Sequence, residues 1–168
     1  MEAIRILVPE DAETFRDIRL EGLFESPDSF GLTYEEYLNR DIEVIKRGLE
    51  AKSGSFTLGA FDSSSQLIGV IGFVQEQSIK FKHKGFVWGM YVRSGYRNQG
   101  VGRRLVEQVI EQAKQIEDLE QINLCVVVGN ENAKSLYELI GFHVYGMEKR
   151  ALKHNGKYYD EELMTLWL

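Results

Sequence analysis

The sequence predicts a single α/β (α+β) domain over residues 1–168, built on a mixed, mainly antiparallel sheet flanked by helices. Three observations predict this class. Strand and helix patterns follow one another in the order βααβββαβαββ, and no linker, repeat or low-complexity segment interrupts them. The length of 168 residues is that of one domain, which buries roughly two-thirds of the surface that its unfolded chain exposes.

The N-terminal part reads as one strand followed by two helices. Residues 3–8 (AIRILV) are apolar and β-branched, and Pro9 with the acidic residues after it is a typical helix start. The sequence SPDSFG (26–31) ends that first helix. Residues 33–51 are predicted to form one second helix, because Thr33 and Glu36 have the spacing of a capping box.

A meander of strands and two further helices complete the chain. Residues 85–92 (GFVWGMYV) form the strongest candidate for a central strand, and Asn155-Gly156 is a hairpin signal. Gly141 is a typical residue for ending the last helix. The predicted elements are strands over 55–61, 67–77 and 85–92, a helix of about 17 residues from Val101, a strand over 121–128, a helix over 130–140, and strands over 142–153 and 158–168.

Composition excludes several classes of protein. Hydrophobic residues at 43% and charged residues at 27% are ordinary for a soluble globular chain, and no apolar run is long enough for a membrane helix. The N-terminus lacks the basic and apolar regions of a secretory signal, so a cytoplasmic location is expected. The single cysteine, Cys125, lies in an apolar strand and is expected to be a buried thiol rather than a nucleophile.

Positive charge is concentrated in one segment. The chain has a formal net charge of −6, yet residues 77–106 contain seven Lys and Arg and no Asp or Glu. This segment therefore carries +7 and the remainder carries −13. The asymmetry predicts an anionic ligand at one place in the molecule.

Two common phosphate-binding patterns fail on this segment. Gly95 and Gly100 have the Walker spacing, but Val101 and Gly102 follow where Lys and Ser or Thr are required. A dinucleotide fingerprint that starts at Gly100 requires glycine where the chain has Leu105.

What remains is a strand, a glycine turn and a helix. Gly100 and Gly102 let backbone N–H groups approach a ligand, and the start of the helix adds unpaired amides. Arg97, Arg103 and Arg104 supply charge around this turn. The turn is therefore an anion cradle that could hold a pyrophosphate without a metal, and no metal site is predicted.

Two motifs identify the family that the chain resembles. The sequence RNQGVG (97–102) matches the pattern [RQ]-x-x-G-x-[GA] of the GCN5-related N-acetyltransferases (GNAT), which use acetyl-coenzyme A. Their later motif N-x-x-A-x-x-L-Y-x-x-x-G-F is matched in full by Asn130, Ala133, Leu136, Tyr137, Gly141 and Phe142. The predicted element order also fits this fold, so the resemblance covers essentially the whole chain.

The resemblance implies roles for matching positions. It implies that main-chain groups of Tyr91 and Val92 pair with the pantetheine arm, that Asn130 contacts that arm, and that Tyr137 protonates the departing thiolate. Asn130 is also a natural helix N-cap, and Tyr137 also fits an apolar helical stripe. The implied residues of the acetyl-CoA turn are Arg97, Asn98, Gln99, Gly100, Val101, Gly102 and Arg103.

The implied reaction is direct attack of a neutral amine on the thioester carbonyl, with main-chain amides around Tyr91 polarising that carbonyl. The residue that deprotonates the amine stays unassigned. The candidates are Glu35, Glu36, His83 and His143.

The acceptor region implied by the resemblance includes Phe30, Tyr34, Trp88 and Met90, with the segment near Tyr158 and Tyr159. Aromatic rings and carboxylates there suit a small cationic amine, such as an amino-acid derivative, an aminoalkyl compound or a polyamine.

Other functions stay open at this point. Acetylation of a protein N-terminus or lysine is one alternative, and a non-catalytic acyl-CoA sensor is another. The overall negative charge argues against a nucleic-acid partner, no membrane partner is expected, and a homodimer is left open.

Overall fold

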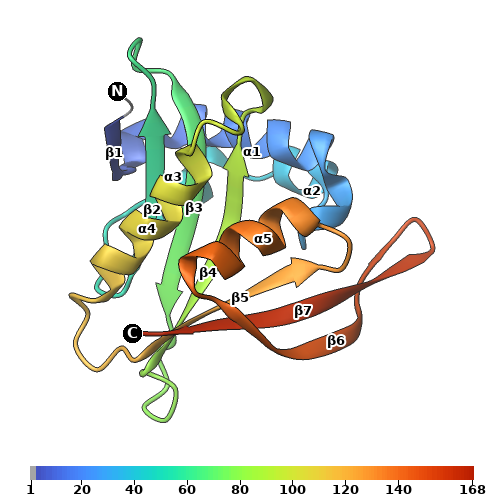
Figure 1. Ribbon diagram of the computed structural model, residues 1–168. Helices are drawn as coiled ribbons and strands as arrows, with labels where there is room; N and C mark the ends of the chain where they lie inside the picture. The colour runs from blue at the N-terminus through green and yellow to red at the C-terminus, as the bar shows by residue number, and fades with distance from the viewer. Residues whose placement is uncertain (1–2) are drawn as a thin grey trace.

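A seven-stranded sheet runs through the computed structural model, which describes residues 3–168 (Figure 1). The strands lie in the order β1-β2-β3-β4-β5-β7-β6, and only the β4–β5 pair is parallel among the pairs of this described chain. The strands are β1 (Ala3–Ile6), β2 (Ser55–Phe61), β3 (Leu67–Gln75), β4 (Lys84–Val92), β5 (Gln121–Val127), β6 (His143–His154) and β7 (Lys157–Trp167). The predicted mixed, mainly antiparallel sheet is confirmed.

Helices cover both faces of this sheet. The helices are α1 (Ala12–Glu25), α2 (Tyr34–Leu38), α3 (Ile42–Gly48), α4 (Val101–Ala113) and α5 (Glu131–Ile140). In Figure 1, α4 and α5 lie in front of the sheet, while α1, α2 and α3 lie behind it. Each face therefore has a hydrophobic core of its own.

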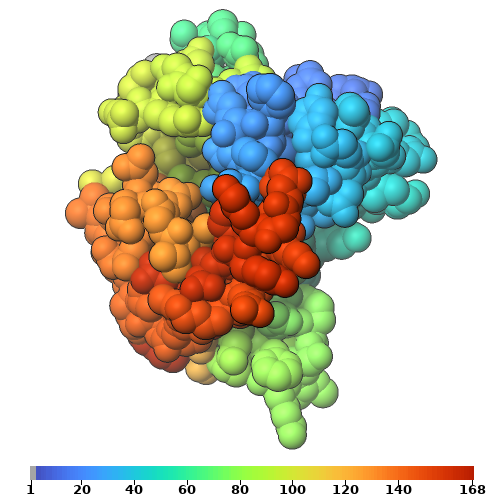
Figure 2. Space-filling model, turned by 90° about the vertical axis from the view of Figure 1, so that its right-hand side faces the viewer, coloured from blue at the N-terminus to red at the C-terminus, as the bar shows by residue number. Residues whose placement is uncertain are grey.

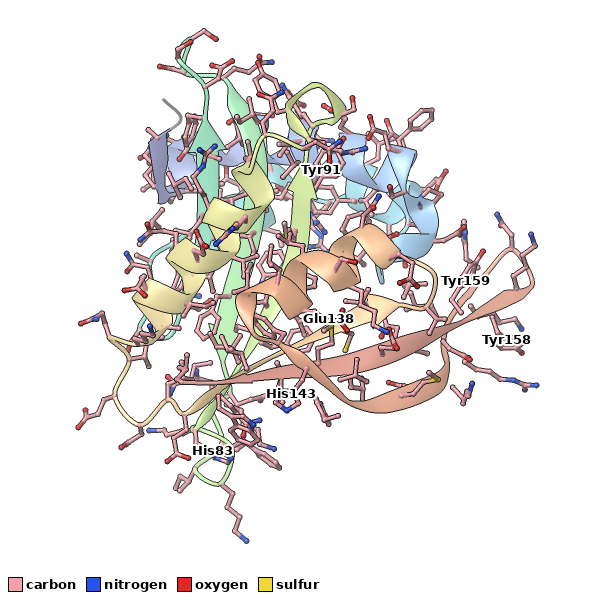
Figure 3. The ribbon with its side chains drawn as sticks, viewed as in Figure 1. His83, Tyr91, Glu138, His143, Tyr158 and Tyr159 are labelled. Atoms are coloured by element: carbon pink, nitrogen blue, oxygen red, sulfur yellow. The ribbon has the colours of Figure 1, made fainter. Side chains whose placement is uncertain are left out.

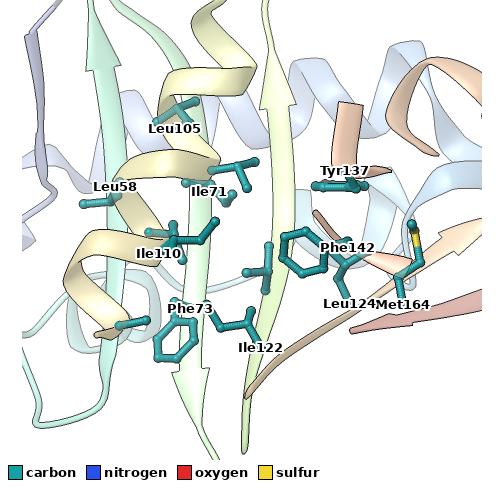
Figure 4. Close-up of a cluster of buried hydrophobic side chains, with 14 of the residues drawn as sticks. Leu58, Ile71, Phe73, Leu105, Ile110, Ile122, Leu124, Tyr137, Phe142 and Met164 are labelled. Atoms are coloured by element: carbon teal, nitrogen blue, oxygen red, sulfur yellow. The ribbon is translucent and has the colours of Figure 1, made fainter. Parts of the chain in front are cut away.

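The two cores share the sheet between them. On the α4 and α5 face, Phe73, Leu105 and Ile122 are fully buried with their neighbours (Figure 4). On the α1 face, Ile18 and Leu23 pack with residues of β3 and β4. Burial on both faces explains why β3 reads as a continuous apolar run.

The parallel pair β4–β5 separates after a short contact. Residues 84–86 of β4 pair with residues 121–123 of β5, and no later pair forms between them in the described chain. On its other edge β4 carries an extra residue, because Tyr91 pairs with Val70 and Trp88 pairs with Gly72. Gly89 within this bulge has a φ of 65°, a conformation that favours glycine. Backbone groups of both strands therefore face an opening in the sheet.

The predicted second helix is wrong as a single element. It is divided into α2 and α3, because Asp41 accepts a hydrogen bond from the Glu43 N–H (2.9 Å) and starts a new helix there. Asn39 donates its side-chain amide to the Glu35 carbonyl (2.9 Å) and ends α2. Short polar side chains compete with helical hydrogen bonds in this way. The capping box of Thr33 and Glu36 is confirmed.

Other local predictions are confirmed. Gly141 ends α5 with a φ of 115°, and Asn155 and Gly156 have φ values of 48° and 77° in the β6–β7 turn. Helix α4 starts at Val101 as predicted but has 13 residues, fewer than the expected length.

Leu105→Ala should lower the free energy of unfolding by about 3 kcal/mol, because it leaves a cavity in the core under α4. Leu105 is 0% exposed, whereas Leu139 is 70% exposed on α5 and supplies the matched control Leu139→Ala. Urea unfolding followed by circular dichroism measures both. Equal loss in the two variants would contradict this placement of the core.

Candidate active site

A cavity of about 950 Å³ occupies the opening between β4 and β5. One wall is residues 86–92 of β4, and the opposite wall is residues 124–127 of β5. Its ends are the turn before α4 and the segment that follows α1, while α5 forms a further wall. The cavity therefore lies where the sheet leaves backbone groups unpaired.

The turn before α4 has the geometry of an anion cradle. Asn98 and Gly100 have φ values of 61° and 81°, and Gly100 is the N-cap of α4. The first hydrogen bond of α4 runs from the Arg104 N–H to the Gly100 carbonyl (3.1 Å), so the amides of residues 101–103 precede the helical ladder. No atom lies within 4 Å of the place where a Cβ on Gly100 would sit. Open space and unpaired amides thus meet at a helix N-terminus.

The second glycine of the turn has a different function. A Cβ on Gly102 would lie 2.7 Å from Met90 Cε and 3.4 Å from Leu136 Cδ2, so this glycine allows α4 to pack closely on β4 and α5. Met90 Sδ accepts a hydrogen bond from the Tyr137 hydroxyl (3.1 Å). The glycine turn and Tyr137 are therefore linked through one methionine side chain.

The arginines near the turn are largely paired with carboxylates. The ion pairs are Arg93 with Glu21 (3.1 Å), Arg97 with Glu25 (2.6 Å) and Arg103 with Glu107 (2.7 Å). Arg97 also donates from Nε to the Val92 carbonyl (2.8 Å) and stacks on the Tyr91 ring. The local charge is therefore lower than the sequence count suggests, since α1 supplies acids that are distant in sequence. Main-chain amides then carry more of the expected anion binding.

Tyr91 joins β4 to α1. Its ring packs against Gly22, and its hydroxyl lies 3.1 Å from Glu21 Oε1 and 2.9 Å from Glu25 Oε2. Burial and the Glu25 carboxylate raise the pKa of Tyr91, so the phenol stays neutral. Tyr91 and Val92 both line the cavity, where the sequence motifs imply main-chain contacts with pantetheine.

Tyr137 lies in the cavity wall formed by α5. It is 6% exposed and packs edge-on against the Phe142 ring at 5.7 Å between centroids. Burial raises the pKa of Tyr137, which keeps the phenol protonated at neutral pH. The side chain both packs in the core and points a proton towards the cavity wall at Met90.

Asn130 lines the cavity and caps α5. Its Oδ1 accepts a hydrogen bond from the Ala133 N–H (3.3 Å), which confirms the N-cap. The same residue is available to a ligand through its amide group, so the two expected functions are compatible.

The acceptor residues expected from the sequence fall into two groups. Phe30, Trp88 and Met90 line the cavity, whereas Tyr34 does not and packs edge-on against Phe24 at 6.2 Å. Gln99 also lies off the cavity wall, since its side chain donates to the Gly95 carbonyl (3.0 Å).

A contact joins two distant segments near the cavity. Asp28 follows α1, and its Oδ1 lies 3.2 Å from Nδ1 of His154 at the tip of β6. Hydrogen bonds from His154 and Tyr159 lower the pKa of Asp28. Figure 2 shows the hairpin tip, in red, against the blue segment after α1. Tyr159 thus supports the wall, while Tyr158 stacks with Arg150 on the hairpin.

The four residues considered as bases lie outside the cavity lining. Figure 3 shows His83 in the β3–β4 loop and His143 at the start of β6, both remote from Tyr91. Glu36 forms the capping box with Thr33, and Glu35 belongs to the same short helix α2.

Glu161 is the carboxylate that the sequence patterns missed. It lies on β7 and is the single Asp or Glu lining this cavity within residues 3–168. Burial raises the pKa of Glu161, and Glu148, its partner on β6, raises it further. Neighbouring Cys125 also lines the cavity, and burial raises the pKa of this thiol to about 11. Cys125 is half-buried and is not activated as a nucleophile, as expected.

Arg19 is the second residue that the sequence patterns missed. It comes from α1, is 6% exposed, and donates from Nη1 to the Gly89 carbonyl (3.1 Å). Its guanidinium lies 5.2 Å from the Phe30 ring centroid and 5.9 Å from that of Trp88. The aromatic rings at the acceptor end therefore already surround a cation of the protein itself.

Residues 3–168 contain no group of three or more His, Cys, Asp or Glu placed to hold a metal ion. In the same residues, no helix combines the length and apolar character that crossing a membrane requires.

A family model described as the acetyltransferase (GNAT) family matches residues 15–142. The chain belongs to the GNAT family. The match includes the glycine turn, β4, β5, α5 and Tyr137, and it ends at Phe142. The β6–β7 hairpin with Glu161 follows the matched segment.

Two curated relatives share part of this sequence. The chain is 32% identical over 78 residues to the L-amino acid N-acetyltransferase AaaT of Escherichia coli, covering 46% of this chain and 48% of that protein. It is also 27% identical over 105 residues to the spermidine N(1)-acetyltransferase of Vibrio cholerae. That alignment covers 62% of this chain and 59% of the other protein. The chain thus aligns with about half to three-fifths of each relative's length.

The fold is shared with a GNAT acetyltransferase structure from Streptococcus pneumoniae. That structure has a TM-score of 0.90 and 24% identity, and the match covers 100% of this chain and 99% of the other. The predicted GNAT fold is therefore confirmed over the described chain.

Proposed function

We propose that this protein is an acetyl-CoA-dependent N-acetyltransferase whose acceptor is the primary amine of a small molecule. The observation that carries the proposal is the single cavity that joins the anion cradle, Tyr137 and Glu161. A cradle suited to a pyrophosphate stands at one end, and two groups suited to proton transfer stand along its walls.

The opening of the sheet fits an extended donor arm. The edge of β4 beyond Phe86 has backbone groups without a β5 partner in the described chain, and an added strand-like ligand can pair with them. Bound there, acetyl-CoA supplies the acetyl group as a thioester. Main-chain N–H groups at the bulge around Tyr91 polarise the thioester carbonyl.

Proton transfers complete the reaction. Glu161 accepts a proton from the acceptor ammonium, and the freed amine nitrogen attacks the thioester carbonyl carbon. As the carbon–sulfur bond breaks, Tyr137 donates its phenolic proton to the departing thiolate, whose thiol has a pKa of about 8.5. The attacking nitrogen releases its second proton to water as the amide forms, and Tyr137 regains a proton from water. The raised pKa of Glu161 brings this carboxylate closer to the range in which a base operates.

Two observations favour a small acceptor. The contact of Asp28 with His154 and Tyr159 ties the segment after α1 to the hairpin, and both of these segments contribute other residues to the cavity wall. The relatives named for amino-acid and spermidine acetylation are consistent with a small amine.

Gly100→Asp should weaken acetyl-CoA binding at least about a hundredfold, because it adds a carboxylate to the cradle and strains a φ of 81°. Isothermal titration calorimetry measures the affinity. Gly95→Asp is the matched control, since it adds the same charge to the same loop in open space off the cavity wall. Wild-type affinity in Gly100→Asp would refute the cradle.

Tyr137→Phe should lower kcat about a hundredfold and leave the KM for acetyl-CoA within about twofold, because only the donated proton is lost. Steady-state release of the CoA thiol measures both constants. Tyr145→Phe removes a hydroxyl from an exposed residue off the cavity wall and should change neither. An unchanged kcat in Tyr137→Phe would show that Tyr137 only packs in the core.

Glu161→Gln should lower kcat about a hundredfold and remove the acidic limb of the pH profile. Since the pKa of Glu161 is raised, its active carboxylate form is lost as the pH falls through that raised value. The wild-type limb should therefore lie above the ordinary glutamate pKa of about 4.3. Glu138→Gln, an exposed change on α5, should keep the wild-type profile (Figure 3). An identical profile in Glu161→Gln would exclude it as the proton acceptor.

A further inference from the structure

A second cavity of about 280 Å³ adjoins the acceptor end of the first. The two cavities share Arg19, Leu32 and Trp88 in their walls. The smaller one extends between α1, α2 and α3, and Arg40 lies in its wall. No Asp or Glu lines the smaller cavity within the described residues, although the chain as a whole is acidic.

Arg19 lacks a carboxylate partner in this setting. Within residues 3–168 it forms no ion pair, and its Nε is buried without a hydrogen-bond partner. Its polar contacts are the Gly89 carbonyl and the Tyr37 hydroxyl, and the rings of Phe30 and Trp88 flank the guanidinium. A buried charge that is not compensated by an opposite charge is destabilising.

The electrostatics of Arg19 are set by three neighbouring features. Burial lowers the pKa of Arg19, Tyr37 partly offsets this effect, and the Arg40 cation lowers the pKa further. Arginine still keeps its proton in proteins, so the guanidinium remains a cation. It is almost fully buried from solvent and lines both cavities. An anionic group of a ligand would supply the missing partner.

We propose that Arg19 binds the carboxylate of the acceptor, and that the acceptor is therefore an amino acid rather than a polyamine. This inference rests on the proposed function, because the ligand's amine must reach the thioester in the main cavity. The planar fork of the guanidinium matches a carboxylate, and one cation balances its single charge. A polyamine would place a further cation beside Arg19 and Arg40, which is unfavourable.

The charges of the two walls also suit an amino acid. Glu161, the carboxylate of the main cavity, lies on the hairpin side, while Arg19 lies on the α1 side. An amino acid has an ammonium group that can pair with Glu161 and a carboxylate that can pair with Arg19. Recognition at both ends would orient the amine towards the donor.

The test is a comparison of acids with neutral analogues on the wild-type protein. The twenty standard L-amino acids, their carboxamides, spermidine and 1-aminoalkylphosphonates are assayed for CoA-thiol release with acetyl-CoA. We expect kcat/KM for the best amino acid to exceed that of its carboxamide and of spermidine by tenfold or more. Equal values for acid and carboxamide, or preference for spermidine or a phosphonate, would overturn the proposal.

Variants assign this preference to the guanidinium. Arg19→Gln should raise KM for the amino acid tenfold or more and bring the ratio of acid to carboxamide close to one. Arg19→Lys keeps the charge without the fork and should recover part of the ratio. Arg47→Gln removes the same charge from an exposed position of α3 and should keep the wild-type ratio. A wild-type ratio in Arg19→Gln would make Arg19 a structural residue only.

Binding measurements separate this proposal from the proposed function. If no compound releases the CoA thiol, the proposed function fails, and Arg19 is then tested by calorimetry on the wild-type protein with CoA present. N-acetyl-L-amino acids should bind at least tenfold more tightly than their carboxamides. Equal binding would refute a carboxylate site, and this comparison needs no variant to fold.

Discussion

Parallel pairing between β4 and β5 stops after residues 84–86, and the rest of the site depends on that early stop. Two strands that separate leave backbone donors and acceptors that must find other partners. The bulge at Gly89 turns β4 away from its regular path, and α4 and α5 fill the front of the sheet without closing the gap. A cavity lined by main-chain groups results, and a ligand can complete the sheet there.

The charges around this gap are arranged by tertiary structure. Helix α1 neutralises Arg93 and Arg97 through Glu21 and Glu25 on one part of its surface. Two residues before Glu21, the same helix places Arg19 at the other end of the cavity without a carboxylate partner. A single helix therefore neutralises positive charge near the glycine turn and supplies a positive charge at the other end of the cavity.

Much of the fold and of the donor site could be predicted from the sequence, because short motifs encode them. The glycine turn, the Asn130 cap and the end of α5 at Gly141 each depend on local backbone preferences. Arg19 and Glu161 could not be found in this way. Arg19 lies on the buried stripe of α1 with Phe15 and Ile18, where the helical period predicts burial but not a contact with a ligand. The orientation of Glu161 depends on how β7 aligns with β5. The division between α2 and α3 did have a local signal, because Asp41 is a typical N-cap residue. The capping box at Thr33 and Glu36 instead predicts the start of one long helix.

The tie between Asp28 and the hairpin has a consequence for how the ligand preference of this cavity could change in evolution. This tie joins two segments more than a hundred residues apart, with His154 and Tyr159 on one side and Asp28 on the other, and both segments contribute residues to the cavity wall. A change in either segment alters the fit of the other, so substitutions there should occur in pairs among diverging descendants. The glycine turn lies outside these two coupled segments, so one end of the cavity could change its ligand while the other end keeps its geometry.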